Sequence, residues 1–97
     1  MIQSFADRGS EDIYNGCNTK AARAVRPRES WNLAARKMDQ LDSAEAPVDL
    51  RTPRGNRFEA LVGDRKGQHS IRVNERYRLC FRWSENGPTD VGIVDYH

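Results

Sequence analysis

The sequence predicts an α+β domain in which about two N-terminal helices pack on an antiparallel sheet of about four to five strands. Three observations lead to this prediction. Between residues 63 and 83, turn residues separate two segments in which apolar and polar side chains alternate, a pattern typical of paired strands. Upstream, apolar residues recur at spacings of three and four, as in a helix with one buried face. The chain has 97 residues, the length of one small domain, so we expect residues 1–97 to form a single domain.

The two alternating segments predict a β-hairpin with one apolar face and one arginine-rich face, because successive side chains of a strand point to opposite sides of the sheet. Asn74 and Glu75 suit the tight connection between the strands. In the second strand one side carries Tyr77, Leu79, Phe81 and Trp83, and the other carries Arg76, Arg78, Cys80 and Arg82. In the first strand His69, Ile71 and Val73 alternate with Ser70, Arg72 and Asn74. We expect the function to reside on the arginine-rich face.

The chain before the hairpin supplies the helices. Residues 2–5 are consistent with a short first strand, and residues 10–15 with a weak helix capped by Ser10. Residues 15–28 lack apolar periodicity, so we expect a mobile loop or a segment that orders on binding. Pro27 suits the first turn of a helix that runs to about Leu41. The predicted buried face of this helix is Trp31, Ala34, Met38 and Leu41.

The remaining segments connect and complete the sheet. Residues 46–56 contain two prolines and a glycine, which break regular structure. Residues 57–62 are predicted to form the strand that leads into the hairpin. Gly87 and Pro88 mark a last turn, and residues 90–97 are predicted to form a final strand that runs to the end of the chain.

Positive charge is concentrated in one part of the sequence. The net charge is only +2, but the segment from residue 54 to residue 82 has eight basic residues against three acidic ones. Such a local field attracts phosphate groups. All but one of these basic residues are arginines, whose planar fork favours bidentate recognition of phosphate or carboxylate. A solvated charged surface is the alternative interpretation.

Several classes of protein do not fit the sequence. No apolar run approaches the roughly 20 residues of a membrane helix, and the N-terminus lacks the pattern of a secretory signal. Cys17 and Cys80 are too few for a disulfide framework, so we expect free thiols in a reducing cytoplasm. The two histidines and two cysteines lack the paired spacing of a zinc site, and there is no phosphate-binding glycine loop or nucleophile elbow. We therefore expect no metal, no cofactor and no membrane association.

The last three residues, Asp95, Tyr96 and His97, each carry a group that handles protons. By simple alternation Asp95 and His97 share one face of the strand and Tyr96 lies on the other. A C-terminal tripeptide is more often a frayed end than a catalytic group, and composition leaves both interpretations open. Combined with the basic face, however, these groups suit metal-free cleavage of RNA. There the 2′-hydroxyl is the nucleophile, and the protein need only transfer protons and stabilise the transition-state charge with arginines.

The segments GNRFEALVGDRKGQHSIRVNERYRLCFRW and DVGIVDYH, together with the opening MIQSFADR, resemble the HigB-type toxins of the RelE/ParE superfamily over nearly the whole chain. The resemblance implies a RelE-like α+β toxin of a type II toxin–antitoxin system, encoded beside a helix-turn-helix, HigA-like antitoxin. It also implies ribosome-dependent cleavage of mRNA at the decoding site, so the ribosome and mRNA are expected partners.

The resemblance also suggests roles for individual residues. It places the catalytic element on Asp95, Tyr96 and His97, an arginine of the penultimate strand on Arg78, and the arginine of the GDR turn on Arg65. Some ribonucleases of this family carry a histidine and a lysine where this chain has Glu59 and Val62, so Glu59 is the candidate base. His69 stands at a usually aromatic position, either stacking on a base or partly buried as a structural imidazole. The expected substrate-binding residues are Arg65, Lys66, Arg57, Arg72 and Arg76.

Two other functions remain open from the sequence. One is a ParE-like inhibitor of gyrase, which performs no chemistry itself. The other is a non-catalytic nucleic-acid-binding module, in which His97 is dispensable. The terminal Asp-Tyr-His sequence favours the ribonuclease over both.

Overall fold

The computed structural model describes residues 1–95 and contains a four-stranded antiparallel meander in the order β1-β2-β3-β4. The strands are β1 (Glu59–Ala60), β2 (His69–Arg72), β3 (Tyr77–Ser84) and β4 (Gly87–Asp95). The α-helices are α1 (Arg8–Tyr14) and α2 (Ser30–Ser43). Short 3₁₀ turns complete the described part: η1 (Ala22–Ala24), η2 (Pro47–Arg51), η3 (Arg54–Asn56) and η4 (Gly63–Arg65). The predicted α+β class, with two helices on an antiparallel sheet, is confirmed.

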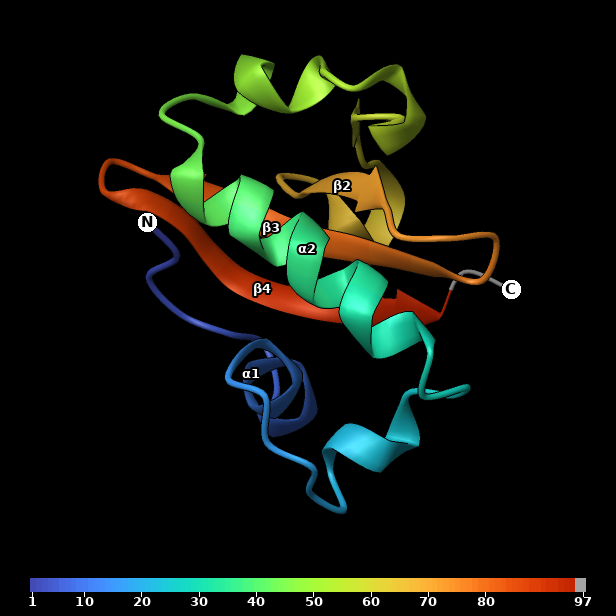
Figure 1. The fold of residues 1–97 in the computed structure, drawn as a ribbon. Coiled ribbons are helices and arrows are strands. Elements are labelled where there is room, and N and C mark those ends of the chain that lie inside the picture. The colour runs from blue at the N-terminus through green and yellow to red at the C-terminus, as the bar shows by residue number, and fades with distance from the viewer. Residues whose placement is uncertain (96–97) are drawn as a thin grey trace.

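The core lies between α2 and one face of the sheet. Figure 1 shows α2 lying across β3 and β4, with α1 beside it. Tyr77, Leu79 and Phe81 of β3 are buried against this helix layer, as alternation predicts. On α2 the predicted stripe of Ala34, Met38 and Leu41 is fully buried. Trp31 is half-buried, and its indole nitrogen donates a hydrogen bond to the carbonyl oxygen of Val25 at 2.9 Å.

The N-terminal segment differs from its prediction in two ways. Residues 2–5 do not form a regular strand; they run beside β4 and pair through a single parallel bridge between Phe5 and Val91. The first helix begins at Arg8, and its cap is Asp7, whose carboxylate accepts a hydrogen bond from the Ser10 amide at 2.7 Å. The Ser10 hydroxyl instead accepts a hydrogen bond from the Ile93 amide at 2.9 Å, joining α1 to β4.

Residues 15–28, expected to form a mobile loop, are anchored to the body of the protein. Ala22 is completely buried within η1. The Thr19 hydroxyl donates a hydrogen bond to Asp12 at 2.7 Å and accepts one from the Ala22 amide at 3.1 Å. The sequence pattern did not predict this anchoring because the segment is held by one small buried residue and several polar contacts, which produce no apolar periodicity.

Several boundaries also shift. The helix expected to begin near Pro27 begins at Ser30, and the strand expected over residues 57–62 is reduced to two residues. The last turn lies at residues 85–86, so β4 begins at Gly87. Gly87 has φ 128°, and a β-carbon there would collide with the carbonyl oxygen of Met1. Only glycine fits this position. Within residues 1–95, no helix has the length and apolar content required to cross a membrane.

Candidate active site

The sheet register gathers polar residues of three strands on the face that points away from α2. Ser70 of β2 lies opposite both Glu59 of β1 and Cys80 of β3. Arg72 lies opposite Arg78 one step further along. Directly opposed residues share a face of the sheet, so these five side chains lie on one side. The predicted polar face therefore exists, although its centre is closed: Ser70 is fully buried and Cys80 is 2% exposed.

Arg78 contacts residues of two neighbouring segments on this face. Its side chain is 15% exposed. Its Nε donates a hydrogen bond to the Ser70 hydroxyl at 3.0 Å, and its Nη2 donates one to the carbonyl oxygen of Arg57 at 2.8 Å. The same Nη2 lies 3.2 Å from a carboxylate oxygen of Glu59. The two predicted site residues Glu59 and Arg78 are thus brought together as an ion pair.

A hollow of about 280 Å³ is lined by Arg78 of this pair, whereas Glu59 is not among its lining residues. Arg57, Arg72 and Arg78 supply cationic groups to it, with Asn74 and Glu75 from the β2–β3 turn completing its wall. The Nε of Arg72 donates a hydrogen bond to the Asn74 carbonyl oxygen at 3.2 Å, which limits its movement. The Arg57 side chain is exposed and has no ion-pair partner within residues 1–95. Three arginines therefore face one carboxylate, that of Glu75, around this hollow, and the excess of positive charge favours an anion there.

Arg76 and Asp95 are separate from this hollow. The Nε and Nη2 of Arg76 each lie 3.0 Å from the same Asp95 carboxylate oxygen. Asp95 opposes Tyr77, whose side chain is in the core, so the register places Asp95 on the helix side of the sheet. Arg76 is engaged with the end of β4 because it lies in the turn before β3, where strand alternation does not apply. Its role in substrate binding stays a prediction.

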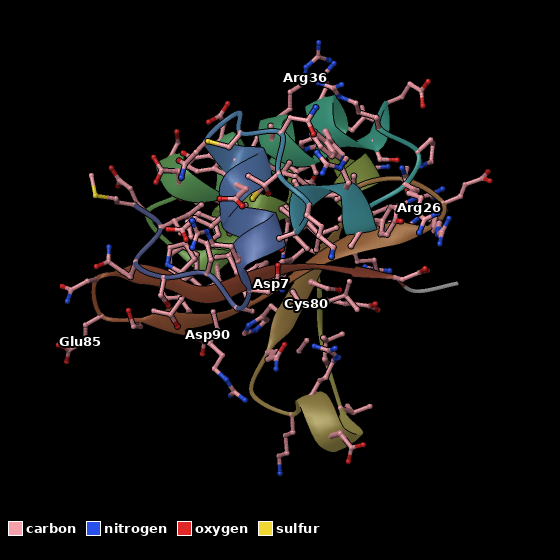
Figure 2. The ribbon with its side chains drawn as sticks, turned by 90° about the horizontal axis from the view of Figure 1, so that it is seen from below. Asp7, Arg26, Arg36, Cys80, Glu85 and Asp90 are labelled. Carbon is pink, nitrogen blue, oxygen red and sulfur yellow. The ribbon has the colours of Figure 1, made fainter. Side chains whose placement is uncertain are left out.

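Arg65 and Lys66 lie on the loop between β1 and β2. Figure 2 shows this loop, with η4 at its tip, extending from the sheet on the side away from α1 and α2. Arg65 is half-buried and donates a hydrogen bond to Gln68 at 3.3 Å, whereas Lys66 is exposed. These two cations thus extend the positive charge beyond the hollow.

The thiol of Cys80 lies within this positive field. Burial raises the pKa of Cys80, and the nearby guanidinium groups of Arg65 and Arg78 lower it less than burial raises it. Cys80 is therefore a protonated, buried group at neutral pH, in contrast to the exposed Cys17. Both cysteines are free thiols in the structure, as the sequence predicts.

His69 lies at the edge of the core. Its ring stacks on Phe58 with a centroid distance of 5.2 Å and an interplanar angle of 5°, and lies 6.2 Å from the ring of Phe81. Its Nδ1 is buried and has no hydrogen-bond partner among the described residues. Of the two predicted roles, the contacts fit the partly buried structural imidazole.

Two of the predicted catalytic residues, Tyr96 and His97, lie outside the described residues. Within residues 1–95, no group of three histidine, cysteine, aspartate or glutamate side chains is placed to hold a metal ion.

Comparison with known proteins gives the identity of the family. Residues 3–97 match the model of the HigB-like toxins, described as RelE-like toxins of the type II toxin–antitoxin system HigB. The chain belongs to this family. It is therefore a toxin of a type II toxin–antitoxin system.

Two relatives by sequence and one solved structure extend this comparison. Over 83 residues the chain is 46% identical to Toxin HigB-1 of Vibrio cholerae, covering 86% of this chain and 84% of that protein. It is 37% identical over 60 residues to an uncharacterized protein of Haemophilus influenzae, covering 62% of this chain and 59% of that protein. The fold resembles a chain of the YoeB–YefM complex from Staphylococcus aureus, with a TM-score of 0.62 over 100% of this chain and 98% of that one. Sequence identity to that chain is 13%, so this last likeness concerns the fold alone.

Sequence reasoning missed two groups that contact Arg78. One is the hydroxyl of Ser70, although its position on the polar side of the alternation was visible. The other is the backbone carbonyl of Arg57, which carries no signal in the sequence because its direction depends on a left-handed conformation (φ 46°, ψ 50°).

Proposed function

We propose that this toxin is a ribosome-dependent endoribonuclease that inhibits translation by cleaving mRNA through metal-free acid–base chemistry. The observation that carries the proposal is the hollow lined by Arg57, Arg72 and Arg78, together with the carboxylate of Glu59 paired to Arg78. Membership of the HigB-like toxins supports the same activity. This arrangement provides both phosphate recognition and a proton acceptor.

Glu59 is the proposed general base. Its side chain is 52% exposed, so a 2′-hydroxyl can reach it. The arginines of the hollow neutralise the charge that develops on the phosphorus centre, where fixed cations contribute most. His97 is the proposed acid that protonates the leaving 5′-oxygen, with Tyr96 donating a hydrogen bond to the substrate. These last two roles follow from the resemblance of the terminal Asp-Tyr-His sequence.

The remaining cations bind nucleic acid further from the reaction. Arg65 and Lys66 are proposed to contact phosphates of the mRNA or of ribosomal RNA, a role supported by their position on the β1–β2 loop that extends from the sheet (Figure 2). Arg76 and Asp95 hold the end of β4, which leads directly into Tyr96 and His97. The proposed partners are therefore the ribosome and its mRNA in the cytoplasm, and a helix-turn-helix, HigA-like antitoxin that neutralises the toxin.

Cleavage of a translated transcript on purified ribosomes tests the proposal. We expect cleavage by the wild type only when ribosomes are present. Arg57→Ala should cleave more slowly than the wild type, because it removes an exposed cation from the hollow. The matched control is Arg36→Ala, which removes an exposed cation from α2, on the helix side of the sheet (Figure 2).

The same assay separates the other two functions. A gyrase inhibitor leaves the transcript intact and instead blocks supercoiling by purified gyrase. A non-catalytic binding module also leaves the transcript intact, although it binds the ribosome with a strong dependence on salt. Either result in the wild type contradicts the ribonuclease.

A further inference from the structure

Ser70 is a buried polar residue at the centre of the arginine-rich face of the sheet. It is fully buried and lies opposite both Glu59 and Cys80 in the sheet. A buried hydroxyl is costly unless it is hydrogen-bonded. Here the hydroxyl oxygen accepts a hydrogen bond from Nε of Arg78 at 3.0 Å.

The Arg57 carbonyl oxygen binds the same guanidinium from another direction. It accepts a hydrogen bond from Nη2 of Arg78 at 2.8 Å. Its direction follows from the left-handed conformation of Arg57, which ends η3. Two acceptors on two nitrogens of a planar, rigid group fix both its position and the orientation of its plane.

Glu59 differs from these two acceptors. Its carboxylate contacts Nη2 of Arg78 at 3.2 Å, but its side chain is 52% exposed, whereas Ser70 is fully buried. The carboxylate side of this pair is in contact with water, which screens its attraction to the guanidinium. A phosphate is also an anion with oxygen acceptors, so it can replace Glu59 at Nη2 while Ser70 and the Arg57 carbonyl keep the guanidinium in place.

We infer that Ser70 is a positioning residue for Arg78, holding the guanidinium in a fixed plane so that a substrate phosphate displaces Glu59 from it. The displaced carboxylate then lies beside the bound phosphate, where it can accept the 2′-hydroxyl proton. The effect of Ser70 on cleavage rests on the proposed ribonuclease function. The claim that Ser70 holds the Arg78 guanidinium in place does not.

The experiment compares Ser70→Ala and Ser70→Thr with the wild type by two measurements on the full chain. The first is hydrogen exchange of the Arg78 Nε proton, followed by ¹⁵N NMR and assigned with Arg78→Lys. The second is single-turnover cleavage of a transcript on purified ribosomes, with ribosome affinity measured separately. Ser84→Ala is the matched control, since Ser84 is also a strand serine whose hydroxyl makes a hydrogen bond, in this case to the Gly87 carbonyl oxygen at 2.8 Å.

In Ser70→Ala we expect faster exchange of the Arg78 Nε proton and cleavage slowed about ten- to a hundredfold, the range for a misplaced catalytic group. Ribosome affinity should stay unchanged. Ser70→Thr keeps the hydroxyl, so its exchange rate at Arg78 Nε and its cleavage rate should both match the wild type. Ser84→Ala should also leave both rates at the wild-type values.

Wild-type exchange of the Nε proton in Ser70→Ala overturns the inference, because the hydroxyl then does not hold Arg78. Faster exchange with an undiminished cleavage rate also overturns it, because orientation is then irrelevant to the reaction. If the wild type itself does not cleave, the proposed function fails, and the exchange measurement still decides whether Ser70 holds Arg78.

Discussion

The phenol oxygen of Tyr77 makes two hydrogen bonds to a single residue, Arg26. It accepts one from the backbone amide of Arg26 at 2.9 Å and donates one to the carbonyl oxygen of Arg26 at 2.7 Å. The ring of Tyr77 is buried in the core, 4% exposed, so its hydroxyl joins the sheet to the end of the 15–28 segment. This contact anchors that segment to the sheet, in addition to the burial of Ala22 and the hydrogen bonds of Thr19.

Tyr77→Phe removes both hydrogen bonds and keeps the ring. We expect the free energy of unfolding to fall by about 1–3 kcal/mol, the sum for two ordinary hydrogen bonds. The amide of Arg26 should exchange faster with solvent, whereas the amide of Leu79 in the centre of β3 should lose little protection. Urea unfolding and amide exchange measured on the same variant check this. Unchanged protection at Arg26 would show that other contacts anchor the segment.

Asn56 is the second anchor of an irregular segment. Its side-chain amide is fully buried and donates to the carbonyl oxygens of Leu50 at 3.1 Å and Thr52 at 3.4 Å. It also donates to Gln40 of α2 at 3.3 Å and accepts from Lys37 of the same helix. One side chain therefore ties residues 46–56 to α2.

Asn56→Ala removes these hydrogen bonds, including the donor to the buried carbonyl oxygen of Leu50. We expect it to lower the free energy of unfolding by about 1–3 kcal/mol, the typical cost of unsatisfied buried groups. Protection of the η2 amides should be lost first. Urea unfolding measures the loss, and Asn32→Ala, at an exposed position of α2, is the control expected to cause no loss. A similar stability for both variants would contradict the role of Asn56.

The sequence was sufficient for the core and for the polar face. Leu79 and Phe81 could be assigned to the core because alternation along a strand depends only on local geometry. Met38 and Leu41 could be assigned for the corresponding reason in a helix. Fold class follows from such patterns when several elements agree.

The contacts in the candidate active site depend on where the strands begin and how they pair, which local sequence patterns do not reveal. Arg76 and Arg78 have the same place in the alternation, yet Arg76 binds Asp95 and Arg78 binds Glu59. The difference arises because β3 begins at Tyr77, and because register brings β1 and β4 to opposite sides of the β2–β3 pair. Cys80 lies on the arginine-rich side of the alternation and is nevertheless buried, which alternation alone does not reveal.

The raised pKa of Cys80 has a consequence at alkaline pH. Burial makes the folded protein keep the thiol proton to a higher pH than the unfolded chain does. The stability that this provides is complete below the ordinary pKa of the thiol and is lost as pH rises through the folded-state pKa. The pKa of Tyr14 is also raised, mainly by burial and then by Asp42 and Asp39. Tyr14 therefore adds a further loss of stability at still higher pH.

Cys80→Ala should therefore reduce the fall in the free energy of unfolding between neutral and alkaline pH, whatever its effect on absolute stability. Urea unfolding at both pH values measures this difference. Cys17→Ala is the control: Cys17 is exposed, so this variant should show the wild-type dependence. An equal pH dependence in Cys80→Ala and the wild type would mean that the thiol does not contribute.

The last prediction concerns Glu59, the proposed base. Glu59→Gln keeps the shape of the side chain and an oxygen that can accept a hydrogen bond from Arg78, but it cannot take up a proton near neutral pH. General acid–base catalysis contributes about a hundred- to ten-thousandfold, so single-turnover cleavage on ribosomes should slow by at least about a hundredfold. Ribosome affinity and the free energy of unfolding should change little, because Glu59 itself is half exposed and the amide oxygen of the glutamine can still accept a hydrogen bond from Arg78. Glu85→Gln, at an exposed turn between β3 and β4, is the matched control and should cleave at the wild-type rate (Figure 2). If Glu59→Gln also cleaves at that rate, Glu59 serves only as the resting partner of Arg78, and the proton must be taken up by another group.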